Sequence, residues 1–558
     1  MRRLFVVFLL LGTLTLPSIP SLYAQRKPAR TAAASPATAA AQRGVDQITA
    51  AQMRSFLTFI ASDEMEGRDT PSRGLDTTAK FIAMNLSRWG FKPAGDDGTY
   101  FQHIGLRRNL VDAAQTHADF NGQALTVGED FIPSSAAGSA SGALVFVGNG
   151  WFIKAKNIDA YKDIDAKGKI AVIFGVPAGL PRGLRRADLA GKQGEDWMNP
   201  TDYARKQGVA GIVYVPDFQF LANWDRNRLR IMERGNTVVE KFQAQGPAQL
   251  PSITVSPKVA NAIFQGEPQN ATAIFEAVYS GGAMPAPFTL KPEKKLNLNV
   301  AVKAETLGTQ NIVAVWEGSD PVLKDEYVAV GAHYDHIGTS PVPVNGDSIF
   351  NGADDDGSGT TALLAMAEAL GHTSSRPKRS VLFVWHCGEE KGLWGSRYFT
   401  DNPTIPLDHI VAQLNIDMIG RSKKDGDTNP RNKDLTGPDG VYVIGSTMMS
   451  TELGELTLAL NKSYLNLNYD LRYDDPADTN RFFFRSDHFN YARKGIPIIF
   501  FFDGVHEDYH QLGDSADKID YQKMEKITRT IYLTLWEVAN RATRPKVDKP
   551  LPAQLTGN

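Results

Sequence analysis

The stretch EYVAVGAHYDH at residues 326–336 decides the fold that we expect for this chain. An apolar, strand-forming run ends directly at His333, and Asp335 follows it. The next segment, NGADDDGSGTTALLAMAEAL at residues 351–370, places three aspartates before a helix-like apolar run. A buried strand followed by a turn and a helix is the repeating unit of a parallel sheet.

The same alternation continues on both sides of this stretch. Further strand-like runs are NIVAVWEG (311–318), SVLFVWHCGEE (380–390), IVAQLNIDMIG (410–420), GVYVIGS (440–446) and GIPIIFFF (495–502). Helix-like patterns lie between and after them, the last at 523–542. We therefore predict an α/β fold, with a mostly parallel central sheet flanked by helices, for a catalytic domain at 291–542. Residues 48–89 have helical periodicity and are followed by a turn and a strand-like run, and we predict that residues 48–124 are the N-terminal part of this domain.

Residues 125–290 differ in character from the rest of the chain. Short β-like runs such as KIAVIFGV (169–176) and GIVYV (211–215) alternate with Gly and Pro turns, and the block contains no histidine. We predict a separate β-rich module inserted into the catalytic domain.

The two ends of the chain are of simpler composition. Arg2-Arg3, an apolar run from Leu4 to Leu16 and small residues up to Ala24 have the layout of a secretory signal peptide at 1–24. The run is shorter than the ~20 apolar residues that a membrane span needs. We therefore expect an exported protein, periplasmic or extracellular, with no membrane association after cleavage. Residues 25–47 predict a flexible Ala/Thr/Pro-rich linker, and residues 543–558 a C-terminal tail.

Composition excludes several classes of protein. The chain has 558 residues, with 60 Lys+Arg against 62 Asp+Glu and a formal net charge of −2. This balance excludes a basic nucleic-acid binder. The single cysteine, Cys387, excludes a disulfide scaffold and a thiolate zinc finger, and we interpret it as a small buried residue of the core.

Polar side chains stand where the predicted strands end. In an open α/β sheet, these ends meet at one crevice, and buried charges there need partners. A mixed set of His, Asp and Glu suits zinc, and two metals ~3.5–4 Å apart need a bridging carboxylate. The residues concerned are His333, Asp335, the triplet Asp354 to Asp356, Glu389, Glu390, Asp417 and His510.

Together, these motifs resemble the M28 family of zinc peptidases, which includes dizinc aminopeptidases and glutamate-carboxypeptidase-like enzymes. The inserted block is similar to the protease-associated (PA) domain of many members, through AKGKIAVI (166–173) and ARKQGVAGIVYV (204–215). The motifs that carry the family resemblance are GAHYDH (331–336), NGADDDGSGT (351–360), CGEEKGLWGS (387–396), LNIDMIG (414–420), RSDHFNYARKGIP (485–497) and EDYHQLGDSADKI (507–519).

The resemblance implies two zinc ions per chain and assigns their ligands. Asp355 would bridge both ions. His333 and Asp417 would complete one site, and Glu390 and His510 the other. His386 and His488 lie near these motifs, but we do not expect them to be ligands.

The resemblance also implies the catalytic roles. Glu389 would be the general base for a dizinc-activated water, and Asp335 would orient the imidazole of His333. Some family aminopeptidases place an oxyanion-stabilising tyrosine near the SDH motif, and this chain has RFFFR before Ser486 instead. Tyr509 could substitute, and Arg485 could contact the substrate. We interpret the phenylalanine runs, and Trp394, as packing residues.

The expected function is that of an exported zinc exopeptidase that acts on peptides, foremost an aminopeptidase. A carboxypeptidase or dipeptidase of the glutamate-carboxypeptidase-like type is the alternative within the family. A single-zinc glutaminyl cyclase and a non-catalytic relative are further alternatives, which the complete ligand set disfavours. The sequence leaves the oligomeric state open. We expect the inserted module to cover the mouth of the active site.

Overall fold

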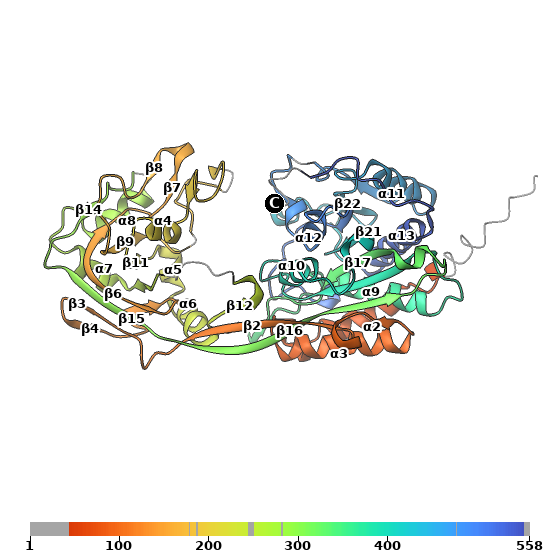
Figure 1. Ribbon diagram of the computed structural model, residues 1–558, viewed down its shortest axis with the longest axis horizontal. Helices are drawn as coiled ribbons and strands as arrows, with labels where there is room; N and C mark the ends of the chain where they lie inside the picture. Colours follow the sequence, from red (N-terminus) through yellow and green to blue (C-terminus); the bar gives the residue numbers. More distant parts are fainter. Residues whose placement is uncertain are drawn as a thin grey trace, which may run out of the picture.

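The protein consists of two lobes joined by a pair of long strands (Figure 1). The computed structural model describes residues 44–177, 179–185, 188–243, 250–280, 283–475 and 477–551. The predicted signal peptide at 1–24, most of the predicted linker at 25–47 and the end of the predicted tail lie outside these residues. Within the described ranges, no helix has both the length and the apolar character needed to cross a membrane.

The larger lobe is built on a ten-stranded sheet in the order β12-β2-β16-β20-β17-β21-β24-β22-β23, with β1 paired to β16. Four central strands, β20, β17, β21 and β24, run parallel, and β16 and β22 pair antiparallel on either side of them. The predicted α/β class is confirmed, and its parallel part is this central block. The strands are β1 (Lys92–Pro93), β2 (Phe101–Val111), β12 (Asn236–Val239), β16 (Val302–Trp316), β17 (Tyr327–His333), β20 (Ser380–His386), β21 (Ile410–Ile416), β22 (Gly440–Ile444), β23 (Asn468–Asp470) and β24 (Ile498–Phe502).

Helices cover both faces of this sheet. On one face lie α2, α3, α9 and α13, and on the other α10 and α12. α9 is buried along nearly its whole length between the sheet and its neighbouring helices, which explains why its sequence is apolar all round. The helices are α2 (Ala50–Ile60), α3 (Arg73–Arg88), α9 (Gly357–Gly371), α10 (Trp394–Asp401), α11 (Thr451–Ser463), α12 (His488–Ala492) and α13 (Tyr521–Asn540).

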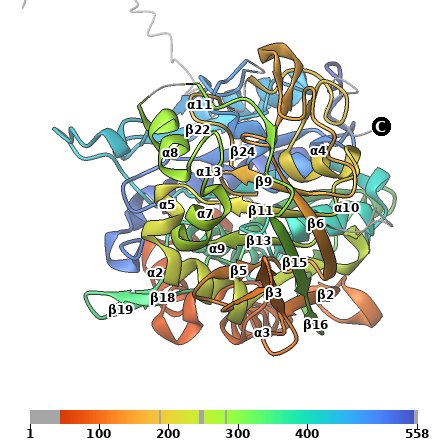
Figure 2. The same ribbon diagram turned by 90° about the vertical axis from the view of Figure 1, so that its left-hand side faces the viewer.

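The second lobe, which we call the inserted lobe, has its own nine-stranded sheet in the order β4-β3-β15-β6-β9-β11-β13-β5, with β14 beside β6 (Figure 2). Strands β6, β9, β11 and β13 run parallel. These strands are β3 (His117–Phe120), β4 (Gln123–Leu125), β5 (Phe131–Pro133), β6 (Gly138–Phe146), β9 (Ile170–Phe174), β11 (Gly211–Val215), β13 (Ser252–Val255), β14 (Phe288–Thr289) and β15 (Lys295–Val300). Its helices include α4 (Pro200–Lys206), α5 (Phe218–Ala222), α6 (Trp224–Leu229), α7 (Pro257–Phe264) and α8 (Ala271–Tyr279).

The inserted sheet extends past the predicted block 125–290 at both ends. Strand β3 precedes that block, β15 follows it, and the two pair antiparallel. The polar residues that alternate with apolar ones in β15, KLNLNV, make it a two-faced strand with a weak sequence signal. The likeness of this lobe to a PA domain stays a prediction.

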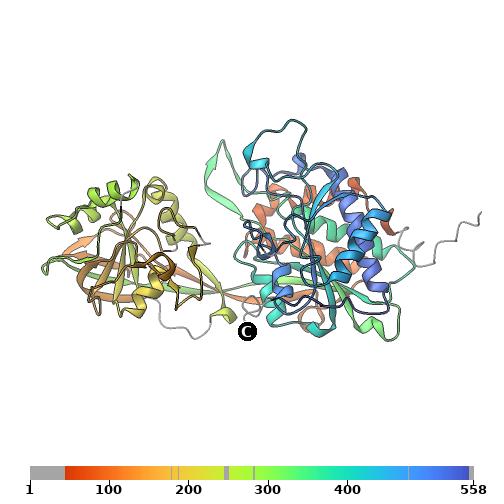
Figure 3. The ribbon, with the colours of Figure 1, turned by 90° about the horizontal axis from the view of Figure 1, so that it is seen from above.

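A two-stranded ribbon connects the lobes (Figure 3). Strand β2 leaves the larger lobe and β16 returns to it, and they pair without a break from Phe101 opposite Ile312 to Val111 opposite Val302. Strand β12, which follows α6 in the chain, pairs with β2 in the larger sheet. The position of the inserted lobe is therefore fixed by three strands.

Candidate metal centre

The carboxyl ends of the central parallel strands bring the five predicted ligands together. His333 is the last residue of β17, Asp417 directly follows β21, and Glu390 lies beyond the end of β20. Asp355 lies in the turn before α9, and His510 lies in the loop after β24. Residues that are up to 177 positions apart in the sequence thus meet at one edge of the sheet.

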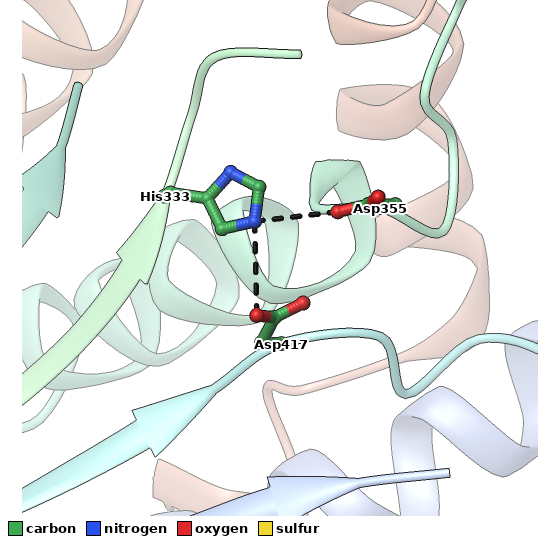
Figure 4. A group of neighbouring side chains, drawn as sticks. All are labelled: His333, Asp355 and Asp417. Atoms are coloured by element: carbon green, nitrogen blue, oxygen red, sulfur yellow. Dashed lines mark ion pairs between the residues drawn. The ribbon is translucent and has the colours of Figure 1, made fainter. Parts of the chain in front are cut away.

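His333 is the centre of one group of side chains (Figure 4). Its Nε2 atom lies 3.3 Å from Oδ1 of Asp355 and 3.7 Å from Oδ2 of Asp417. All three side chains are buried, and their ligand atoms are close enough to hold one metal ion.

A second group contains the other oxygen of Asp355. Oδ2 of Asp355 lies 3.0 Å from Nε2 of His510, which in turn lies 3.1 Å from Oε2 of Glu390. The two oxygens of Asp355 therefore face two different histidines. This is the arrangement in which a carboxylate can bridge two cations.

The sequence analysis missed His336, which also faces this second group. Its Nδ1 atom lies 2.8 Å from Oε1 of Glu390 and 3.8 Å from Oδ2 of Asp355, and its ring is fully buried. The sequence signal that could have identified His336 as a candidate ligand was its position, three residues after His333 at the end of β17. Four side chains therefore surround the second position.

Unpaired polar atoms show that the site fits a cation. Nε2 of His333, Oδ2 of Asp355, Oε1 of Glu390 and Nε2 of His510 are buried and have no hydrogen-bond partner among the residues that the structure describes. Each such atom costs about 1–3 kcal/mol when it is left unsatisfied. Imidazole nitrogens and carboxylate oxygens are ligands that zinc accepts. The donor set therefore fits the zinc ions that the sequence predicts.

Two carboxyl groups at the site have pKa values shifted in opposite directions. Burial alone would raise the pKa of Asp355, but the neighbouring imidazoles of His333 and His510 outweigh burial and hold this pKa well below its usual range. Burial raises the pKa of the Glu389 carboxyl well above its ordinary value, and the charges of Glu390 and Asp417 raise it further. Asp355 is thus ionised, as a ligand must be, while Glu389 readily accepts a proton.

Asp335 contacts the imidazole of His333 through its main chain, whereas the resemblance implies a contact through its carboxylate. Nδ1 of His333 lies 3.2 Å from the main-chain oxygen of Asp335, but 3.7 Å from its carboxylate. The carboxylate oxygen Oδ1 instead accepts a hydrogen bond from the backbone N–H of Glu389 at 3.1 Å. Asp335 therefore orients both the imidazole ring of His333 and the backbone of Glu389.

The two other aspartates of the triplet fix the loop that carries Asp355. Asp356 accepts hydrogen bonds from the backbone N–H groups of His333 and Met418, and it also caps α9. Asp354 accepts one from the backbone of Gly420. The carboxylate of Asp514, which lies beyond His510 in the chain, accepts from the backbone N–H groups of both Asp354 and Asp355. Only the middle aspartate of the triplet is left to face the metal position.

The buried Arg68 supports the same loop from the N-terminal region. Its guanidinium donates to four main-chain oxygens, of Ile60, Tyr334, Asn351 and Gly352, at 2.7–2.9 Å. Burial lowers its pKa to about 10, so the group is charged at neutral pH. Arg68 thus joins three separate parts of the chain beneath the site.

Replacing Arg68 by methionine should therefore lower the free energy of unfolding of the larger lobe by at least about 3 kcal/mol, because four buried carbonyls lose a charged donor. Urea denaturation measures this loss. Arg88→Ala, at an exposed position of α3, is the control and should change stability by less than about 0.5 kcal/mol. Equal stability of the two variants would contradict the role of Arg68.

A small hollow adjoins the metal position, with a volume of about 40 Å³. Three carboxylate residues, Asp355, Glu389 and Asp417, line it. Tyr509 and Arg485 line it as well; the Tyr509 ring stacks on His510, and Arg485 Nη2 donates to the Tyr509 hydroxyl at 3.4 Å. The rest of its lining is mainly apolar: Met418, Phe482, Phe500, Phe502 and Val505.

Residues that we expected to be structural are buried outside the two groups. Cys387 lies in the core of the larger lobe, and Trp394 packs against that core. Burial lowers the pKa of His386 and of His488 to about 3, so that both rings are neutral. The phenylalanines at 500–502 are buried in β24, as expected, and two of them also line the hollow.

The sequences of known proteins resemble part of this chain. Residues 311–535 match peptidase family M28. A probable zinc metalloprotease of Pyrenophora tritici-repentis is 29% identical over 259 residues, which cover 42% of this chain and 58% of that protein. Leucine aminopeptidase 2 of Arthroderma otae is 27% identical over 287 residues, covering 46% and 50%. Aminopeptidase Y of Saccharomyces cerevisiae is 29% identical over 265 residues, covering 43% of each chain. This chain thus spans about half the length of these relatives.

A solved structure extends the likeness of the fold to both lobes. The aminopeptidase from Aneurinibacillus sp. strain AM-1 aligns with a TM-score of 0.52 over 91% of this chain and 98% of that one. The sequence identity is 15%. This match shows that the two folds are alike.

Proposed function

Because residues 311–535 form a peptidase family M28 domain, we propose that this chain is a zinc-dependent aminopeptidase that removes apolar residues from the amino terminus of peptides. The observation that carries the proposal is the convergence of unpaired buried ligand atoms beside a small hollow with a mainly apolar lining. The names of the relatives, zinc metalloprotease and leucine aminopeptidase, agree with it.

In this proposal two zinc ions are held by the five predicted residues. His333, Asp355 and Asp417 hold one, and Asp355, Glu390 and His510 hold the other. When bound, the ions would supply Lewis acidity that polarises the scissile carbonyl and makes the attacking water more acidic.

Glu389 takes the proton of the attacking water and later delivers it to the leaving amine. Oε2 of Glu389 lies 3.9 Å from Nε2 of His333, so the carboxylate faces the metal position. The hydrogen bond from its backbone N–H to Asp335 holds this residue in place. Its raised pKa favours proton transfer near neutral pH.

The relatives favour action at the amino terminus of a peptide over action at the carboxyl terminus. Two of them are named leucine aminopeptidase 2 and aminopeptidase Y. The apolar part of the lining of the hollow suits an apolar side chain.

The test compares one peptide, Leu-Ala-Ala-Phe, with a free and with an acetylated amino terminus. We expect zinc-loaded protein to release leucine from the free peptide only, and a chelator to abolish the release. Mass spectrometry of the products measures this. Trimming of both forms from the carboxyl end would instead show a carboxypeptidase.

A further inference from the structure

A second and larger hollow lies between the two lobes. Its volume is about 1180 Å³, above the range of roughly 300–1,000 Å³ for pockets that enclose a drug-sized ligand, so it has room for several amino-acid residues. We call it the interlobe cleft. Its walls include Trp151, Trp197 and Arg205 of the inserted lobe and Arg481, Phe484 and Arg485 of the larger lobe.

The interlobe cleft adjoins the small hollow at the metal position. Arg485 lines both spaces. Its guanidinium contacts the hydroxyl of Tyr509 on the side of the metal centre. A peptide whose amino terminus lies at the metal position can therefore continue past Arg485 into the cleft.

On the larger lobe, the cleft presents two arginines that lack acidic partners. The Arg481 guanidinium lies over the ring of Phe484 at 4.6 Å, and that of Arg485 lies over Phe482 at 5.0 Å. Among the described residues, neither forms an ion pair with a carboxylate, and both are exposed. On the opposite wall, by contrast, Arg205 is paired with Asp202 at 2.8 Å. The ligand that suits a free guanidinium is a carboxylate.

The inserted lobe supplies an aromatic wall to the same cleft. The rings of Trp151 and Trp197 stack with centroids 6.5 Å apart, and Trp197 is half-buried. The indole N–H of Trp151 donates to the main chain of Gly179, which holds this ring in place. The ring of Trp197 therefore offers contact area to an extended peptide, and the buried ring of Trp151 supports it from behind.

We propose that the interlobe cleft binds the part of a peptide that lies downstream of the scissile bond, and that Arg481 and Arg485 select peptides with a carboxylate there. This inference rests on the proposed aminopeptidase function. The carboxylate comes either from the carboxyl terminus of a short peptide or from an acidic side chain of a longer one. The inserted lobe thereby takes a direct part in the choice of substrate.

The test uses Arg481→Ala, with Arg88→Ala as the control at an exposed site on α3. Substrates are leucine amide, Leu-Ala-Ala-Phe with a free carboxylate, the same peptide as its amide, and Leu-Ala-Asp-Phe amide. For each protein we compare kcat/KM for each peptide with kcat/KM for leucine amide. In Arg481→Ala the ratio for peptides with a carboxylate should fall about tenfold, which is the effect of one lost charge-assisted hydrogen bond. The ratio for the uncharged peptide amide should stay within twofold.

The two acidic substrates distinguish the sources of the carboxylate. A fall for the free-carboxylate peptide alone assigns the cleft to carboxyl termini, and a fall for the aspartate peptide alone assigns it to acidic side chains. An unchanged ratio for both, or an equal fall for all peptides, overturns the assignment of Arg481. Trp197→Ala should weaken all extended peptides relative to leucine amide, because the aromatic wall carries no charge.

A binding measurement separates this inference from the proposed function. Fluorescence anisotropy of the labelled peptides, in a Glu389→Gln background that prevents turnover, should show a Kd about tenfold higher when Arg481→Ala is added. If the Kd rises in this way but wild-type protein cleaves no peptide, the peptide-binding role of the cleft is supported and the aminopeptidase proposal fails. If cleavage occurs and the Kd does not change, the cleft proposal fails.

Discussion

Replacing Glu389 by glutamine is expected to lower kcat by about 10²–10⁴-fold while the zinc content remains that of the wild type. The amide keeps the size of the side chain but cannot accept the proton of the attacking water. Glu389 also stands outside the two groups of candidate ligands, so its loss leaves the ligand atoms in place. Steady-state kinetics and metal analysis of the same sample measure both quantities.

The neighbouring Glu390→Gln variant is the matched contrast to this result. The substitution is chemically the same, but Glu390 lies within 3.1 Å of His510 and faces the second metal position. We expect this variant to lose about one zinc ion per chain. If Glu389→Gln lost zinc, or turned over at a rate close to that of the wild type, Glu389 would not be the general base.

Replacing Asp355 by alanine is expected to release zinc from both positions and to abolish activity. Each oxygen of Asp355 faces a different histidine, so a single truncation removes a ligand from each position. The carboxylates and imidazoles that remain then lack the one carboxylate that faces both metal positions. Metal analysis after dialysis should show fewer than one zinc ion per chain, against about two for the wild type.

Thermal stability gives a second measurement for this variant. Zinc at about 100 times its Kd should stabilise wild-type protein by about 2.7 kcal/mol, and it should barely shift the Tm of Asp355→Ala. Asp347→Ala, at an exposed position in the strand β19 (Asp347–Ile349), is the control and should respond to zinc as the wild type does. Retention of two zinc ions by Asp355→Ala would show that Asp355 does not bridge the positions.

The sequence was most informative where polar residues follow apolar strands. The runs before His333, Glu389 and Asp417 are too apolar to end in charged residues by chance, and the structure brings these residues together. The class of the fold could be predicted for the same reason. The direction of the outer strands β16 and β22 could not be predicted, because an apolar run has the same pattern in a parallel and in an antiparallel pair.

Other features of the site depend on contacts between distant segments. His336 stands three residues after His333 in the sequence, but the contact of its buried ring with Glu390 forms only in the folded chain. The bond from Glu389 to the Asp335 carboxylate and the support from Arg68 likewise arise only when the chain is folded. The interlobe cleft combines residues of both lobes, so neither lobe considered alone predicts it.

The ribbon of β2 and β16 also constrains the order in which the chain can assemble. β16 lies between β2 and β20 in the larger sheet, yet Val111 and Val302, which pair at the far end of the ribbon, are roughly 190 residues apart in sequence. Closing so long a loop directly is entropically costly. The pairing of β3 with β15 in the inserted lobe, with His117 opposite Asn299, closes the chain at nearly the same separation, so whichever pair forms first removes most of this entropy cost for the other. During synthesis β2 can meet β16 only after the inserted lobe, which lies between them in the sequence, has been made.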